Sequence, residues 1–296
     1  MKFSVIIPVF NDFDRLEHCV EALLGQQTEE TFELLVVDNG SQPPLPLNSW
    51  ADPKVRILSE PSPGSYAARN RGVGAAQGEV LLFVDADCLP EPDWIRRAGE
   101  ALSRTGADLV AGKVELYAAN PERPNAAELF DMLCGLDQRR AVSRDHAFTA
   151  NLAVRRRVMD QLQGFNASAT SGSDVELTRR AVTQGFTLAY CDRMLVRHPA
   201  RNSLSEYRRK IRRLVSGSYQ LRDESEYFRS SFTLLRILGN CLRPPLTAMR
   251  VYHCDRAAPF SWLQRFKAIA VLFHNKYYMQ WLRVEYRFGL QSEQYR

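Results

Sequence analysis

The sequence lacks the features of a membrane-spanning or disulfide-stabilised protein. No stretch reaches about 18 uncharged apolar residues, the length that a helix needs to cross a bilayer. The six cysteines among the 296 residues form no CxxC pair, and none lies near a second Cys or a His at the spacing of a structural zinc site. The first residues carry one Lys and a short apolar run containing Pro8, so no secretory signal is visible. We therefore expect a cytoplasmic protein with reduced cysteines and no membrane span.

The charge of the chain is unevenly distributed. The formal net charge is only +5, but residues 201–296 hold 18 Lys and Arg against 7 Asp and Glu, whereas residues 1–200 hold 21 against 27. With 45% hydrophobic and 25% charged residues, the composition is that of an ordinary folded protein, and the length allows about two domains. The break in charge predicts an acidic domain over residues 1–200 and a basic helical region over residues 201–296.

Apolar runs alternate with helical patterns along the first 200 residues. Residues 3–9, 32–37 and 80–84 are almost continuously apolar, as is typical of strands buried on both faces of a sheet. The alternation predicts an α/β fold with a largely parallel sheet covered by helices on both faces. Further strands are expected at residues 55–58, 109–117 and 187–191, helices at residues 16–24 (with Asn11 as N-cap), 65–76, 94–102 and 126–140, and a small-residue loop at residues 149–155.

Polar residues follow these strands where each strand ends, at the edge where α/β sheets bind ligands. Asp85 and Asp87 come directly after the strand at 80–84, and two adjacent carboxylates there are suited to a hard divalent cation that bridges a diphosphate. A second Asp-x-Asp sequence, Asp12 and Asp14, lies in the first turn of a predicted helix, where acidic side chains complement the helix dipole. We therefore expect the metal at Asp85 and Asp87 and not at the other pair.

A helix that begins near residue 173 offers a candidate general base. Ser173 and Glu176 fit the Ser-x-x-Glu capping box, which gives Glu176 a structural task. Asp174 projects from the first turn beside a Gly-Ser loop and is the better candidate for a base, with dipole compensation as the alternative. His198 follows a short predicted strand, and from spacing alone a single His is more often a surface or core residue than a ligand.

The helix predicted at residues 65–76 begins with Gly64 and carries small side chains apart from Tyr66. Such a helix can approach a ligand closely, although an Ala-rich packing helix with solvated arginines is the alternative. The glycines at residues 72–78 lie at the end of this helix and not between a strand and a helix, so they do not form a dinucleotide-binding loop. A Rossmann-type dehydrogenase is therefore not expected.

In their order and spacing, these motifs resemble those of family 2 glycosyltransferases of the GT-A fold. The resemblance covers roughly residues 1–200 and rests on Ile7-Pro8-Val9, residues 36–41, Ala68-Arg69-Asn70, residues 83–87, Thr149-Ala150-Asn151 and residues 173–176. It implies a Rossmann-like mixed sheet flanked by helices, with a C-terminal helical extension. It also implies an inverting transferase that uses a nucleotide-diphosphate sugar and a divalent cation, Mn²⁺ or Mg²⁺.

The resemblance assigns roles to single positions. It implies that the nucleotide is bound by Pro8, Val9, Asp38, Asn39, Arg69, Asn70 and Asp85. It places the sugar pocket at Thr149, Ala150 and Asn151. It implies that Asp174 is the catalytic base and that Asp87 is a metal ligand, with Asp85 close to the metal. In several GT-A enzymes a His beyond the base completes the metal site, and His198 is the corresponding residue here.

Three departures from the family pattern refine these expectations. Ser173 precedes Asp174 where the family usually has Glu. Asn39 replaces a frequent second Asp, which leaves UDP, the favoured nucleotide, beside GDP and dTDP. The Gln-x-x-Arg-Trp signature of processive synthases is absent, so we expect transfer of one sugar to a glycan or lipid-linked acceptor in cell-surface polysaccharide or glycoconjugate biosynthesis.

Two rival interpretations remain open. A non-catalytic member of the fold could bind glycan or membrane without turnover. A sugar-nucleotide pyrophosphorylase would use a related sheet and metal, but it needs a Gly-rich loop with a basic residue after the first strand, and Phe10-Asn11-Asp12 has neither.

The basic region combines arginines with apolar residues at helical spacing. Residues 204–218 and 260–288 follow this pattern, the second with many aromatic side chains, and Pro244-Pro245 is expected to separate two helical parts. The mixture suits peripheral contact with an anionic membrane at the inner face of the cytoplasmic membrane. A helical subdomain with a solvated basic face is the alternative. Nucleic-acid binding is not expected, because no recognised motif accompanies the charge.

Overall fold

The computed structural model describes residues 2–46 and 49–290, and the chain forms two compact units. Unit 1 takes residues up to 115, 136–168 and 173–198, and unit 2 takes residues 116–135, 169–172 and those from 199 on. The chain therefore visits unit 2 twice before it enters that unit for the last time at residue 199, whereas the charge break at residue 200 predicts a single boundary. No helix within residues 2–46 and 49–290 combines the length and apolar character required to cross a membrane.

Unit 1 contains most of an eight-stranded mixed sheet in the order β3-β2-β1-β4-β7-β6-β8-β5. Strands β1 to β4 pair in parallel, whereas β7 runs antiparallel to β4 and β6, and β5 runs antiparallel to β8. The expected mixed sheet is thus confirmed. The strands are β1 (Lys2–Val9), β2 (Thr31–Asp38), β3 (Val55–Ser59), β4 (Val80–Val84), β5 (Leu89–Pro90), β6 (Leu109–Tyr117), β7 (Asn151–Arg155) and β8 (Leu188–Pro199).

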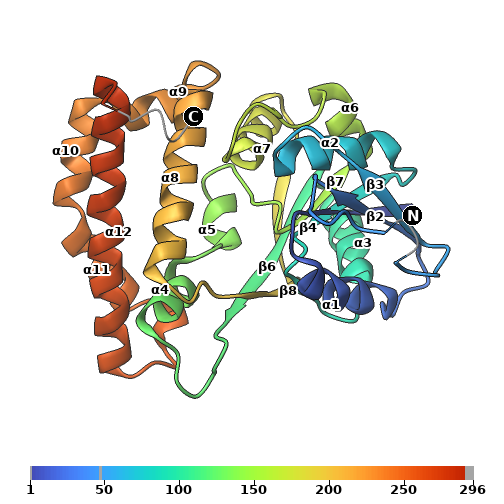
Figure 1. Ribbon diagram of the computed structural model, residues 1–296, viewed down its shortest axis with the longest axis horizontal. Coiled ribbons are helices and arrows are strands. Elements are labelled where there is room, and N and C mark those ends of the chain that lie inside the picture. The colour runs from blue at the N-terminus through green and yellow to red at the C-terminus, as the bar shows by residue number, and fades with distance from the viewer. Residues whose placement is uncertain (1, 47–48, 291–296) are drawn as a thin grey trace. The chain divides into compact units, whose positions relative to one another are not determined.

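Helices cover both faces of this sheet (Figure 1). Because side chains alternate along a strand, Val5 and Ile7 of β1 belong to one buried cluster with α1 and α3, and Ile6 belongs to another with α2, α6 and α7. The near-continuous apolar strands follow from this burial on both faces. The helices of unit 1 are α1 (Phe13–Leu24), α2 (Ser65–Ala75), α3 (Trp94–Thr105), α5 (Gln138–Val142), α6 (Arg156–Leu162) and α7 (Ser173–Thr183).

The single helix predicted at residues 126–140 is wrong, because the chain breaks after α4 (Ala126–Cys134) and resumes with α5. Gly135 is extended, and Leu136 has a φ of +39°. A Cβ atom on Gly135 would lie 2.3 Å from Oδ1 of Asp131, so only glycine permits this close approach. The break coincides with the passage of the chain from unit 2 to unit 1.

Three further local expectations are wrong. The N-cap of α1 is Asp12 and not Asn11. The loop predicted at residues 149–155 is mostly strand β7, because these residues pair with both β4 and β6. The short strand predicted at residues 187–191 continues to Pro199, so that His198 lies within β8. The last two differences share one cause, since strand pairing between distant segments outweighs the weak local signals.

Unit 2 is helical, with two buried apolar clusters. One joins α4, α11 and α12, and the other joins α8 and α12, which run side by side in Figure 1. The helices α10 and α11 are separated at Arg243, directly before the expected break at Pro244-Pro245. Besides α4, the helices are α8 (Leu204–Gln220), α9 (Glu226–Arg229), α10 (Leu234–Leu242), α11 (Pro244–Tyr252) and α12 (Trp262–Phe288), with short 3₁₀ turns at Leu221–Asp223, Ser230–Phe232 and Asp255–Ala257.

Candidate active site

The carboxyl ends of the central strands meet at one edge of the sheet. In the parallel pairing of β1 with β2, Val9 stands opposite Asp38, and the carbonyl of Val9 accepts the N–H of Asn39 at 2.9 Å. Pro8 precedes Val9 in β1, and β4 ends at Val84 on the other side of that strand. The predicted nucleotide-binding strand ends are therefore neighbours, and Asp85 and Asp87 follow next to them.

Asp38 and Asn39 shape the loops around this edge. The two oxygens of the buried Asp38 accept backbone N–H groups from Ser41 and Leu45, at 3.0 and 2.9 Å. The amide oxygen of Asn39 accepts the N–H of Gly64 at 2.8 Å, directly before α2. Both side chains accept hydrogen bonds from backbone N–H groups of the loops. Contact with a nucleotide base stays a prediction for each.

Arg69 of α2 pairs with Asp85 of the site. Its Nη2 atom lies 2.5 Å from Oδ1 of Asp85, and its Nε atom is buried without a hydrogen-bond partner among the described residues. A buried N–H group without a partner is costly, so this guanidinium is suited to receive an anionic group. Asn70 has another task, because its amide bonds both the N–H and the carbonyl of Phe165. Its predicted contact with the nucleotide stays a prediction.

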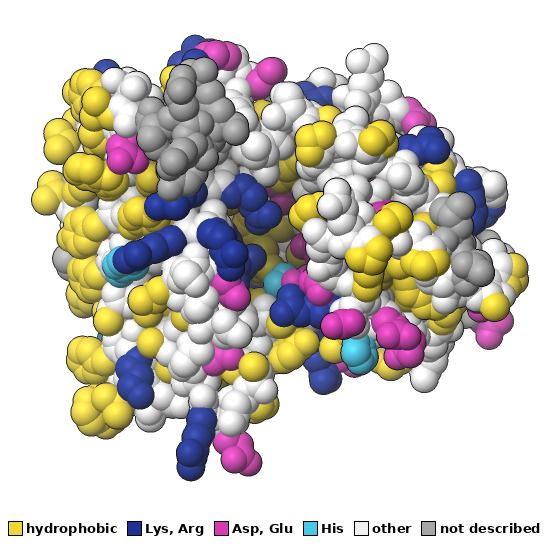
Figure 2. All heavy atoms as spheres, viewed as in Figure 1, with side chains coloured by type: hydrophobic (Ala, Val, Ile, Leu, Met, Phe, Trp, Pro, Cys, Tyr) yellow, Lys and Arg dark blue, Asp and Glu magenta, His cyan; other side chains and the backbone are white. Residues whose placement is uncertain are grey.

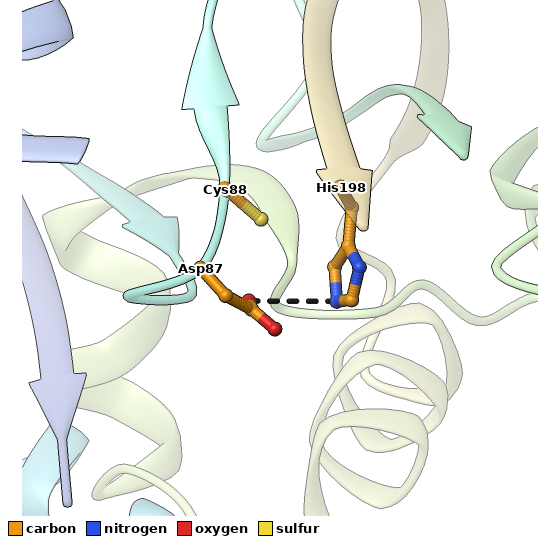
Figure 3. Close-up of side chains that lie close together, drawn as sticks. All are labelled: Asp87, Cys88 and His198. Carbon is orange, nitrogen blue, oxygen red and sulfur yellow. Dashed lines mark ion pairs between the residues drawn. The ribbon is translucent and has the colours of Figure 1, made fainter. Parts of the chain in front are cut away.

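The neighbours Asp87 and Cys88 come together with His198, which lies 110 residues further along the chain (Figure 3). Strand β5 pairs antiparallel with β8 so that Leu89 stands opposite Arg197, and the next position of that register brings Cys88 toward His198. Oδ1 of Asp87 lies 3.5 Å from Nε2 of His198. The structure thus juxtaposes two of the three predicted metal ligands.

The geometry around Asp87 fits a divalent cation. Ligand atoms of Asp87, Cys88 and His198 all lie within 4.8 Å of one another, and two atoms 3.5 Å apart can both contact a cation at about 2.1 Å. Burial raises the pKa of Asp87; the charge of nearby His198 lowers this pKa, and the charge of Asp85 raises it further. A bound cation would therefore stabilise the ionised carboxylate. Burial also raises the pKa of Cys88 well above its usual range. A protonated thiol is a poor ligand for a hard cation, which leaves Asp87 and His198 as the fitting donors.

Asp174 lies in the first turn of α7, where three donors hold its carboxylate. Its Oδ1 accepts the hydroxyl of Tyr66 at 3.0 Å and the N–H of Val175 at 2.9 Å, and its Oδ2 accepts the N–H of Thr149 at 3.4 Å. Burial raises the pKa of Asp174, whereas the charge of Arg69 and the hydrogen bond from Tyr66 lower it. A half-buried, oriented carboxylate with a raised pKa suits a general base.

The capping box predicted for α7 is wrong. The helix begins at Ser173 itself, and the hydroxyl of Ser173 is buried without a hydrogen-bond partner among the described residues. Glu176 pairs with Arg180 one turn further along, at 2.7 Å. Glu176 therefore has a structural task, but a different one.

Residues 149–151 lie beside the acidic strand end, because Asn151 stands opposite Val84 in the pairing of β7 with β4. Thr149 and Ala150 are buried there as well. The side chain of Asn151 is fully buried: its amide group donates to the carbonyls of Lys113 and Met194, and its oxygen accepts Nε1–H of Trp94. Asn151 thus holds the strands together, and its predicted contact with the sugar stays a prediction.

Sequence reasoning missed two members of the site. Cys88 directly follows Asp87, a local signal that could have been used. Tyr66 was noted only for its size, and no local signal indicates its bond to Asp174, 108 residues away. The ring of Tyr66 stacks on Phe165 at 5.6 Å, with the guanidinium of Arg69 at 5.5 Å from the ring centre.

Comparisons with known proteins identify the family of this chain and its fold. Residues 4–163 match the family model described as glycosyl transferase family 2. The glycosyltransferase AglE of Haloferax volcanii is 35% identical over 225 residues, covering 74% of this chain and 73% of that protein. The pre-mycofactocin glycosyltransferase of Mycobacterium tuberculosis is 29% identical over 213 residues, which span 69% of this chain but 44% of that protein.

One solved structure has a similar fold along almost the whole chain. It is the mannosyltransferase PcManGT of Pyrobaculum calidifontis, in complex with GDP-Man and Mn²⁺. It matches with a TM-score of 0.67 and 16% identity, over 98% of this chain and 88% of that one. At this identity the match shows the fold.

Proposed function

The chain belongs to glycosyl transferase family 2 and is a glycosyltransferase, and on that premise we propose that it transfers one sugar, with inversion, from a nucleotide-diphosphate sugar to a hydroxyl of a glycan or lipid-linked acceptor. The observation that carries the proposal is the 3.5 Å approach of His198 to Asp87 at the end of β4. A carboxylate with a purely structural role would not need an imidazole from a segment so far along the chain beside it. A cation that holds the donor diphosphate would need both side chains, of Asp87 and of His198, as ligands.

Asp87 and His198 would hold a divalent cation, Mn²⁺ or Mg²⁺, which supplies positive charge to the leaving diphosphate when bound. The Mn²⁺ in the complex of PcManGT supports this proposal. Asp85 would lie next to the cation and the ribose, where Arg69 orients its carboxylate. The buried N–H of Arg69 would add a donor for the phosphates.

Asp174 would take the proton of the acceptor hydroxyl as that oxygen attacks the anomeric carbon. Three hydrogen bonds fix the carboxylate, so little reorganisation would accompany proton transfer. Since the attack displaces the nucleoside diphosphate in one step, the configuration of the sugar would invert. No acidic residue at position 173 is needed for this role.

Three nucleotides are candidates for the donor. The sequence favours UDP over GDP and dTDP, whereas the GDP-Man bound to PcManGT makes GDP an equal candidate. We place the enzyme in cell-surface polysaccharide or glycoconjugate biosynthesis, on the cytoplasmic side of the membrane. A lipid-linked acceptor would require peripheral contact with that membrane through the basic region.

A donor-binding and turnover experiment tests the proposal. Thermal shift with UDP, GDP and dTDP, each with and without Mn²⁺, should show stabilisation that needs the metal with one nucleotide. Hydrolysis of the matching nucleotide sugars should then need Asp87 and Asp174. Asp87→Ala should lose metal-dependent binding, and Asp174→Asn should bind the donor without turnover. Asp14→Ala, at the exposed second Asp-x-Asp sequence, is the matched control and should behave as wild type.

Each rival interpretation gives a different result. A non-catalytic member would bind nucleotide or glycan but release no sugar from any donor. A pyrophosphorylase would form a nucleotide sugar and pyrophosphate from a nucleoside triphosphate and a sugar phosphate. Donor hydrolysis that is indifferent to both EDTA and Asp87→Ala would refute the metal-dependent mechanism.

A further inference from the structure

Unit 2 turns a row of large apolar side chains toward solvent. On α10 the exposed residues Leu235, Leu238 and Leu242 share one side of the helix, and Leu235 and Leu242 are 84% and 80% exposed. Figure 2 shows yellow side chains gathered along the left edge of this view, over α10 and α11. We call this set the α10–α11 apolar face; it comprises Leu235, Leu238, Leu242, Leu246 and Met249, with Phe266 and Trp262 of α12.

The α12 members join the face through ring contacts. Phe266 lies 6.0 Å from Tyr252 at the end of α11 and 6.1 Å from Trp262. The side chains of Trp262 and Phe266 are more than half exposed. A surface helix of a globular protein normally turns its apolar stripe toward the core, so exposed leucines on α10 need an explanation.

Positive charge accompanies this face. From Tyr227 to Val284 the chain holds nine Lys and Arg and a single acidic residue, Asp255. Three exposed arginines, Arg236, Arg243 and Arg250, each directly follow an exposed apolar residue of the face. Within the described part of the chain, none of the three forms an ion pair with a carboxylate. Their charge therefore remains available to an anionic partner.

We propose that the α10–α11 apolar face is the surface through which this protein rests on an anionic lipid bilayer. Leucine and methionine side chains would enter the acyl boundary, Trp262 would lie at the headgroup level, and the three arginines would meet lipid phosphates. The apolar side chains suit the acyl layer of the membrane. The bordering arginines, which form no ion pair with a carboxylate among the described residues, suit the layer of lipid headgroups.

The arginine-rich helix α8 is a weaker candidate for this contact. Its apolar residues Tyr207, Ile211 and Val215 are buried within unit 2, while its arginines are exposed. Apart from Leu204 at its first position, which is 43% exposed, α8 therefore offers charge but no large exposed apolar side chain within the described residues. The sequence pattern indicates residues 204–218 and 260–288 for membrane contact, which covers α8 and α12 with its Trp262 and Phe266. It gives no signal for α10, which is short and carries little charge.

A second copy of the chain is also disfavoured as the occupant. In a two-fold interface the same patch faces itself, so Arg236, Arg243 and Arg250 of both copies would gather in one interface, and the face as defined holds no acidic residue to pair with them. A lipid surface removes this conflict, because it supplies the negative charge.

The inference deepens the proposed membrane contact but does not rest on sugar transfer. A protein without turnover could still bind vesicles, and an active enzyme could fail to bind them. Measuring donor hydrolysis beside vesicle binding keeps the two outcomes separate.

The test is co-flotation of the full chain with vesicles of phosphatidylcholine alone and of phosphatidylcholine with about one third phosphatidylglycerol. Wild type should float with the anionic vesicles and less so at high salt. Leu235→Ser with Leu242→Ser should weaken this binding by about 100-fold, since both side chains lose their burial in lipid. Both leucines are exposed, so circular dichroism and donor hydrolysis should remain as in wild type.

A charge-matched pair of variants assigns the surface. Arg236→Gln with Arg243→Gln removes two charges from the apolar face and should weaken binding by about 10-fold or more. Arg209→Gln with Arg213→Gln removes two exposed charges from α8 and should have little effect. The proposal is overturned if wild type binds neither kind of vesicle, or if the α8 pair has the larger effect. It is also overturned if the leucine variant leaves vesicle binding unchanged and instead converts a dimer to a monomer in sedimentation equilibrium.

Discussion

The hydrogen bond between Tyr66 and Asp174 allows the proposed base to be tested without removing it. Tyr66→Phe deletes one hydroxyl, which donates to Oδ1 of Asp174 at 3.0 Å. The remaining ring keeps its stacking on Phe165 and its contact with Arg69. The perturbation is therefore confined to the stabilisation of the carboxylate.

The size and direction of the effect follow from this bond. A hydrogen bond to a charged group contributes about 1.5–3 kcal/mol, and one pKa unit corresponds to about 1.4 kcal/mol. Burial already raises the pKa of Asp174, and the Tyr66 bond lowers it. Without the hydroxyl the pKa should rise further, by about 1 to 2 units. Because the base acts as a carboxylate, activity should then be lost at a higher pH as the solution is acidified.

The assay is the pH dependence of kcat/KM, since this quantity reports the ionisation of the free enzyme. The acid limb of Tyr66→Phe should lie about 1 to 2 pH units above that of wild type, with kcat/KM approaching the wild-type value at high pH. Tyr190→Phe is the matched control, because it removes a similar bond, from Tyr190 to Asp192 at 2.9 Å, on the exposed part of β8. Its profile should not move.

Two results would refute the reasoning. An acid limb that stays in place would mean that Asp174 is not the group whose ionisation limits the reaction. A uniform loss of activity at every pH, with an unchanged profile, would mean that the hydroxyl acts only through structure.

Three further predictions concern the site and the fold. His198→Ala should raise the Mn²⁺ concentration needed for donor binding by about 10-fold or more, measured by thermal shift, and His198→Gln should recover part of it. Asn151→Ala should lower the free energy of unfolding in urea by about 2–4 kcal/mol, because two buried carbonyls and the Trp94 N–H lose their partner. Gly135→Ala should cost about 1–3 kcal/mol in the same assay, since its Cβ would meet Asp131; an unchanged midpoint would contradict the close approach.

Local signals in the sequence were sufficient to predict the central strands of the sheet and the acidic residues that follow β4. The apolar runs at β1, β2 and β4 predicted buried parallel strands, because burial on both faces leaves no polar position within a strand. Asp85 and Asp87 were recognised because they directly follow such a run. The family resemblance then assigned roles to positions by their order, and the family model confirms the family while the roles stay predictions.

Tertiary structure decided the features that join distant segments. His198 meets Asp87 because β5 pairs with β8, and Tyr66 meets Asp174 because α2 and α7 cover the same face of the sheet. The exposure of the apolar side of α10 could likewise not be predicted, because an apolar stripe has the same sequence pattern whether it faces a core or solvent. Sequence periodicity records which residues share a face. Only the packing of the other elements determines what lies opposite that face.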